Sequence, residues 1–210
     1  RKMCEKRKLS SASLCVLETR WWISSNRGIL ALLSLLCSNI ARVCRTCQNG
    51  LKSRGIGADW YDFMYSPQKV WDMDQRLIVP FYWKGDVVGY TGRIFTGSDK
   101  VKYYTDVQPG YVFNMDAQDW TRKFVIVTEG PFDAITISGV SILGSEINDT
   151  QRELIDNLGR QVIVVPDRDA PGDKLIDQAI EFGWSVAFPE WEKSVSDVAE
   201  AVQKYGRLFT

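Results

Sequence analysis

The chain has 210 residues, of which 45% are hydrophobic and 25% charged, a composition typical of a globular protein with one sizeable core or two small ones. It contains no histidine, which excludes Ser-His and Cys-His nucleophilic schemes and two-His zinc hydrolase sites within this chain. The net charge of zero conceals an asymmetry: residues 1–55 carry eleven Lys and Arg against two acidic residues, whereas the remainder carries fifteen against twenty-four.

Residues 1–50 form a basic segment that contains all five cysteines. We expect a helix over residues 21–43, and a segment that is either a linker or a truncated zinc module. The basic charge of residues 1–55 favours an anionic polymer as their partner, and the acidic charge of the remaining residues favours bound metal ions. A solvated basic tail explains the same charge equally well. The chain begins with Arg1, as expected for a piece of a longer protein.

The cysteines indicate a reducing compartment. Their number is odd and no secretory signal is present, so we expect a cytoplasmic location in a bacterium or an infected host cell. The apolar run over residues 29–37 is too short to span a bilayer, and we expect no membrane contact. Cys44 and Cys47 supply half a zinc site at best, because the chain has no second Cys-x-x-Cys. We favour free thiols; the alternative is zinc held with Cys15 and Cys37 or with residues outside this chain.

Residues 51–120 are predicted to form a small α+β lobe. A short helix ending at residues 51–54 and a second helix over residues 58–64 precede the strands. Apolar runs on both sides of the turn at residues 84–86 indicate an antiparallel sheet. Its strands are expected over residues 77–83, 87–91, 92–95 and 102–104.

Residues 121–210 alternate between apolar strands and helices, which predicts an α/β fold with a parallel sheet and right-handed crossovers. Two of the strands are apolar throughout, as is typical of buried parallel strands. We expect Asp149 to cap the second helix and Gly159 to end it. The strands are expected over residues 124–128, 140–143, 161–166 and 185–188, and the helices over residues 132–138, 150–158, 172–182 and 196–205.

Acidic residues follow two of these strands. Glu129 and Asp133 follow the first strand, and Asp167, Asp169 and Asp173 follow the third. Open α/β sheets bind their ligands at the carboxyl ends of such strands. Carboxylates crowded there repel one another unless a cation lies between them, and Mg²⁺ prefers hard oxygen ligands. The pattern therefore predicts a magnesium site for phosphate chemistry, and the alternative is a set of carboxylates that cap helices.

These motifs resemble parts of a known family. The acidic motifs resemble the TOPRIM fold of primases and topoisomerases, through Glu129-Gly130, Asp133, Asp167-x-Asp169 and Gly172. The upstream runs resemble the N-terminal lobe of the RNA polymerase domain of DnaG-type primases, at residues 76–81, 88–93 and 102–104. The resemblance covers about residues 50–210, and phage-encoded primases are the nearest match. It implies a Rossmann-like TOPRIM domain, with a mainly parallel sheet and flanking helices, over residues 121–210 after a small α+β lobe.

The resemblance also implies roles for the acidic residues. Glu129, Asp167 and Asp169 would be catalytic and would bind metal. Asp173 would be a further metal ligand, or an acid favoured by the start of its helix.

Other residues would support this site. Gly130 would let the backbone approach closely, and Asp133 would orient a nearby basic group. Lys193 and Asp197 resemble the downstream Lys-Asp element of these primases, although a surface helix start explains the pair equally well.

The candidates for binding nucleotide or template lie in the upstream lobe. Arg93 and Lys102 would meet phosphates, since Arg offers a bidentate fork for them; the alternative is ordinary charge on a strand face. The aromatic residues there either stack on bases or fill the core of the small sheet, and they are Tyr82, Trp83, Tyr90, Tyr103 and Tyr104.

The resemblance implies a DNA primase, which synthesises short RNA primers from ribonucleoside triphosphates on single-stranded DNA. Mg²⁺, or Mn²⁺ in its place, would be the cofactor, and a replicative helicase would be the partner. Two alternatives remain open. The first is another TOPRIM enzyme, namely a topoisomerase fragment or a nuclease. The second is a non-catalytic module that holds single-stranded DNA during replication.

Overall fold

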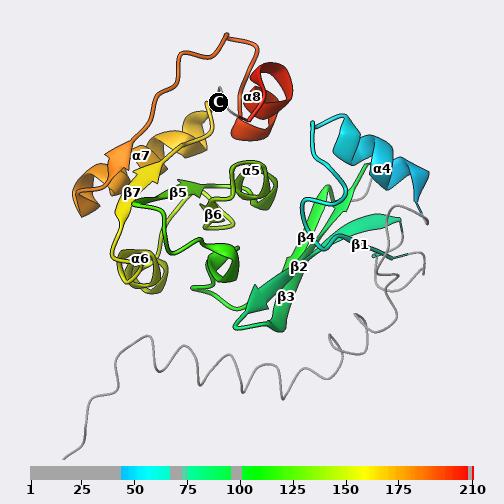
Figure 1. The fold of residues 1–210 in the computed structure, drawn as a ribbon, viewed down its shortest axis with the longest axis horizontal. Helices are drawn as coiled ribbons and strands as arrows, with labels where there is room; N and C mark the ends of the chain where they lie inside the picture. The colour runs from blue at the N-terminus through cyan, green and yellow to red at the C-terminus, as the bar shows by residue number, and fades with distance from the viewer. Residues whose placement is uncertain (1–43, 67–72, 74, 96–100, 208–209) are drawn as a thin grey trace, which may run out of the picture.

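Two four-stranded sheets lie side by side in the protein (Figure 1). The computed structural model describes residues 44–66, 73, 75–95, 101–207 and 210. The predicted helix over residues 21–43 lies outside the described residues, as do Cys15 and Cys37. Among the described residues, no helix has the length and apolar content needed to cross a bilayer.

The first sheet is antiparallel throughout, as predicted, with the strand order β1-β2-β3-β4. Residues 87–94, predicted to belong to two strands, form one continuous strand. Helix α4, Arg45–Lys52, precedes the sheet and ends within the predicted residues 51–54. The strands are β1 (Met64–Ser66), β2 (Arg76–Trp83), β3 (Asp86–Ile94) and β4 (Tyr103–Asp106).

The predicted helix over residues 58–64 is wrong. Its last residue, Met64, pairs with Ile78 as the start of β1. Two aromatic side chains in this stretch face the core instead: Phe63 is buried, and the Tyr61 hydroxyl donates to Pro80 O at 2.6 Å. Packing of these aromatic side chains against β2 thus outweighs the weak local preference for a helix.

The second sheet is parallel, with the strand order β6-β5-β7-β8, and helices alternate with its strands as the sequence predicts. The strands are β5 (Phe124–Thr128), β6 (Val140–Ser141), β7 (Gln161–Val164) and β8 (Ser185–Val186). The helices are α5 (Pro131–Ile137), α6 (Asp149–Asp156), α7 (Ala170–Phe182) and α8 (Val198–Tyr205), and a 3₁₀ turn, η1 (Met115–Ala117), precedes β5.

The cap of α6 differs from the prediction by one residue. Asn148, not Asp149, is the N-cap: its side chain accepts from the Gln151 amide, while the Gln151 side chain accepts from the Asn148 amide. This reciprocal pair satisfies two amides that the first helical turn leaves free. Gly159 follows the end of this helix with a φ of 64°, which suits the predicted stop.

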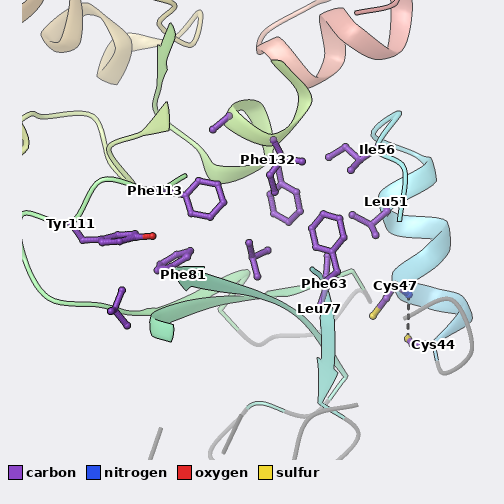
Figure 2. Packing of buried hydrophobic residues seen from close by; sticks show 14 residues of the cluster. Cys44, Cys47, Leu51, Ile56, Phe63, Leu77, Phe81, Tyr111, Phe113 and Phe132 are labelled. Atoms are coloured by element: carbon purple, nitrogen blue, oxygen red, sulfur yellow. Dashed lines mark hydrogen bonds between the residues drawn. The ribbon is translucent and has the colours of Figure 1, made fainter. Parts of the chain in front are cut away.

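An aromatic core joins the two sheets (Figure 2). Phe132 from α5 stacks on Phe63, and Phe81 from β2 meets Phe113 edge-on. Helix α4 closes one end of this core through Leu51 and the free, buried thiols of Cys44 and Cys47. The core therefore holds the small lobe against α5, whose N-terminus lies at the carboxyl end of β5.

Candidate active site

The two acidic loops meet at one edge of the parallel sheet. Strands β5 and β7 are direct neighbours, with Val127 paired to Val164, so the loops that follow them lie side by side. Glu129 from the first loop and Asp167 and Asp169 from the second line a common cavity of about 540 Å³. Its opposite wall is the antiparallel sheet. The structure thus brings together carboxylates that are 38 or more residues apart in sequence.

Glu129 and Asp167 are in direct contact. Glu129 Oε1 accepts a hydrogen bond of 3.2 Å from the Asp167 amide, and Ser141 Oγ donates to Glu129 O at 2.6 Å. Burial raises the pKa of Glu129. Burial also raises the pKa of Asp167 to about 8, with further contributions from Asp133 and Glu129. Two carboxyl groups that resist ionisation in one cavity favour an incoming cation.

Asp169 and Asp197 combine a place in the cavity with a helix cap. Asp169 Oδ1 accepts from the Gly172 amide at 3.0 Å and caps α7, and Asp197 Oδ1 accepts from the Glu200 amide at 2.7 Å and caps α8. Both side chains also line the cavity. The helix-cap alternative is therefore correct for Asp169 in part, and it leaves the second carboxylate oxygen for other contacts. The N-terminal ends of α7 and α8 both lie at the cavity, where their partial positive charge favours anions.

Two glycines allow the backbone to pass close to these carboxylates. A Cβ on Gly130 would lie 2.6 Å from Asp133 Oδ2, and a Cβ on Gly172 would collide with Asp167 O and lie 3.3 Å from Glu129 Oε1. Any side chain at residue 172 would therefore displace the turn that presents Asp167.

Asp133 is only 5% exposed, although it lines the cavity. Its Oδ1 accepts from the Ala199 amide at 2.9 Å, which ties α5 to the first turn of α8. Burial raises the pKa of Asp133 to about 7, and Arg54 acts in the opposite direction. The predicted role was to orient a basic group, but the hydrogen-bond partner that the structure gives is a backbone amide.

The cations are distributed differently from the prediction. Lys102 is exposed and lines the cavity, whereas Arg93 is 6% exposed and does not line it. Arg54, for which no role was predicted, lines the cavity with its guanidinium 5.7 Å from the Phe132 ring. Only its place in the basic N-terminal quarter distinguished it in the sequence. Lys193 is exposed in the loop before α8 and does not line the cavity.

Asp173 faces a second hollow. This hollow, of about 330 Å³, shares Asp167 and Asp169 with the first cavity and extends to Phe188 and Trp191. Asp173 itself does not line the first cavity.

The donor set suits a Mg²⁺ ion that takes few ligands from the protein. In the part of the chain that the structure describes, no three Cys, Asp or Glu side chains form a ready ligand cluster for a metal ion. Magnesium, however, is commonly held by one or two carboxylates, with water and substrate phosphates as the other ligands. Asp167 Oδ1 is buried and has no hydrogen-bond partner among the described residues, so one hard oxygen is available for such an ion.

The fold matches solved structures of DnaG-type primases. No family model matches the sequence, and a search of curated proteins finds no significant match. The catalytic domain of a DnaG primase bound to single-stranded DNA is 17% identical and superposes with a TM-score of 0.68 over 91% of this chain and 77% of that chain. The RNA polymerase domain of Mycobacterium tuberculosis DnaG is 16% identical, with a TM-score of 0.63 over 98% and 81%. The primase fragment of the bacteriophage T7 primase-helicase is 20% identical, with a TM-score of 0.58 over 74% and 70%. At these identities the likeness shows a shared fold: a mainly parallel α/β sheet preceded by a small antiparallel lobe.

Proposed function

We propose that this chain is the catalytic core of a DNA primase, that its parallel sheet is a TOPRIM domain, and that the protein is encoded by a phage. One observation carries the proposal: in the fold of DnaG-type catalytic domains, the carboxylates after β5 and β7 share a cavity with Lys102 of the antiparallel lobe. Nucleotidyl transfer requires that the negative phosphates be neutralised from both sides. Carboxylates that bind a cation on one side of the cavity and basic side chains on the other meet this requirement.

The reaction forms a bond between a 3′-hydroxyl oxygen and the α-phosphate of a ribonucleoside triphosphate, breaks the bond to the β-phosphate, and releases pyrophosphate. Glu129, Asp167 and Asp169 would hold Mg²⁺ or Mn²⁺, with Asp173 next to them in the adjoining hollow. The bound metal ion would lower the pKa of the hydroxyl and stabilise negative charge on the leaving group. The hydroxyl proton would pass to a carboxylate oxygen of Glu129.

The triphosphate would bind to the basic side chains opposite the carboxylates and to the N-terminal ends of α7 and α8. Lys102 and Arg54 supply positive charge there, and the first turns of α7 and α8 present amides to the cavity. Asp133 would hold α8 in position through the Ala199 amide.

The template would be single-stranded DNA, and the basic residues 1–55 would help to hold it. Two structural neighbours support these partners: one is a DnaG domain bound to single-stranded DNA, and another is a fragment of a primase-helicase. A replicative helicase is therefore the protein partner that we propose.

Primer synthesis on single-stranded DNA, with labelled ribonucleotides and Mg²⁺, tests the proposal. We expect product from the wild-type chain and a loss of roughly 100-fold or more in Asp167→Asn and Asp169→Asn. Asparagine caps helices as well as aspartate does, so a loss in Asp169→Asn would report the missing charge and not the α7 cap. Asp177→Asn, on the exposed face of α7, is the matched control and should keep full activity.

Other results would overturn the assignment. Metal-dependent cleavage of DNA without synthesis would identify a nuclease. Binding of single-stranded DNA with neither reaction would identify a non-catalytic module.

A further inference from the structure

One face of the antiparallel sheet forms the wall of the cavity opposite the carboxylates. In the β3–β4 register, Arg93 pairs with Tyr103 and Thr91 pairs with Thr105, so these four side chains share a face of the sheet. Thr91, Tyr103 and Thr105 line the cavity, and the two threonine hydroxyls are 2.8 Å apart. Tyr103 is 37% exposed, whereas Phe132, the other aromatic residue that lines the cavity, is 1% exposed, so Tyr103 offers the accessible aromatic ring.

Arg93 lies behind that ring. Its Cζ is 4.7 Å from the centre of the Tyr103 ring, 5.6 Å from that of Phe132 and 5.1 Å from that of Phe95. Its Nε and Nη1 atoms are buried and have no hydrogen-bond partner among the described residues. Burial lowers the pKa of Arg93 to about 10, so the side chain remains a cation at neutral pH. Contacts between the guanidinium and these aromatic faces are therefore attractive, and the charges of Asp197 and Asp133 also favour the cation.

The backbone under Tyr103 is also held firmly. Arg76 is 1% exposed and donates from Nη2 to Val101 O at 2.8 Å and from Nη1 to Gly92 O at 3.1 Å. These bonds tie the segment just before β4 to β3 and limit the movement of Tyr103.

We propose that Tyr103 is the stacking platform for a nucleobase in this cavity, and that Arg93 is a positioning residue that holds its ring. The inference rests on the proposed function and adds the element that binds the base. Lys102 is the adjacent phosphate contact, since it lines the same cavity with its Nζ 6.0 Å from the Tyr103 ring. The base belongs to the template strand or to the incoming nucleotide. Stacking accepts every base, because each presents a π-face, so Tyr103 contributes affinity without reading sequence.

Tyr104 provides a control within the same strand. It is 42% exposed, similar to Tyr103, but it lies on the other face of the sheet and stacks on Tyr90 with ring centres 6.3 Å apart. It does not line the cavity. Substitution of Tyr104 therefore removes an exposed tyrosine of the same lobe without touching the proposed platform.

The test uses the full chain and fluorescence anisotropy with two labelled strands of equal length, oligo-dT and an abasic oligonucleotide. Tyr103→Leu keeps apolar bulk but has no π-face, and it should weaken oligo-dT binding by about 5- to 150-fold while leaving abasic binding unchanged. Tyr103→Phe should retain the wild-type affinity, and so should Tyr104→Leu. Arg93→Gln should weaken oligo-dT binding, and Arg93→Gln combined with Tyr103→Leu should be no weaker than Tyr103→Leu alone, because the two residues act through one ring.

A second arm separates the two sources of the base. If the base is that of the incoming nucleotide, Tyr103→Leu raises KM for the ribonucleotide in primer synthesis and leaves oligo-dT binding unchanged. Thermal unfolding of each variant checks that the fold is intact.

Two results would overturn the inference. Equal loss of oligo-dT and abasic binding in Tyr103→Leu would mean that the variant acts through structure. No change in either oligo-dT affinity or nucleotide KM would mean that no base contacts this ring. In both cases the wild-type chain would still make primers, whereas a wild-type chain that neither makes primers nor binds DNA refutes the proposed function itself.

Discussion

Asp133→Asn should make the stability of the protein less dependent on pH. Asp133 is 5% exposed, and burial raises its pKa from 3.8 to about 7. The folded state therefore binds this proton more tightly than the unfolded state does. It follows that the free energy of unfolding falls as the pH rises from about 4 to about 7 and stays low above that range. Asparagine is neutral at every pH and still offers Oδ1 to the Ala199 amide.

The size of the effect follows from the same pKa. Integrated from pH 4.5 to pH 8, the difference in unfolding free energy between variant and wild type should change by about 3 kcal/mol, in favour of the variant at high pH. This is an upper value, because relaxation and entry of water reduce the penalty for a buried charge. Even a third of it exceeds the error of a denaturation experiment.

Urea denaturation of both proteins at pH 4.5, 6 and 8, with EDTA to exclude bound cations, measures this difference. The comparison between variant and wild type cancels the titration of other carboxyl groups that the substitution does not affect. Asp177→Asn, which removes an exposed charge from α7, is the control for the loss of one carboxyl group at the surface. A constant difference for Asp133→Asn from pH 4.5 to pH 8 would show that Asp133 ionises normally, and the argument from burial would be wrong.

Three further predictions test the site and its supports. Gly172→Ala should destabilise the protein by about 1–3 kcal/mol and impair synthesis, because the added Cβ collides with Asp167 O. Gly144→Ala lies in the same cavity, where an added Cβ meets nothing within 4 Å, and should be nearly neutral; equal unfolding midpoints for the two variants would contradict this prediction. Asn148→Ala should lower the free energy of unfolding, measured by denaturation, by about 1 kcal/mol, because it removes the cap of α6. Primer synthesis should be unchanged, because the capping box lies outside the cavity, and a loss of synthesis would contradict this prediction. The affinity for Mg²⁺, measured by calorimetry, should rise from pH 6 to about pH 8, because burial raises the pKa of Asp167 to about 8 and this carboxyl group must release its proton to bind the ion. An affinity independent of pH would exclude Asp167 as a ligand.

The sequence determined the parts of this protein that depend on local pattern. Apolar β-branched runs bounded by turns predicted β5 and β7, because a strand buried on both faces needs apolar residues at consecutive positions. Alternation of such strands with helices then implied a parallel sheet, and a parallel sheet brings the residues after its strands to one edge. Glu129 and Asp167 could therefore be expected together before any contact between them was known.

What only the tertiary structure decided concerns residues whose environment comes from distant segments. Arg93 and Lys102 look alike in the sequence as strand-face cations, yet Phe132 and Tyr103 enclose the first and leave the second in the cavity. Arg54 enters the same cavity because α4 packs on the aromatic core. The physical reason is that side chains from distant segments, packed between the two sheets, set the burial and the electrostatic environment of these residues. The local sequence pattern does not encode which side chains those are.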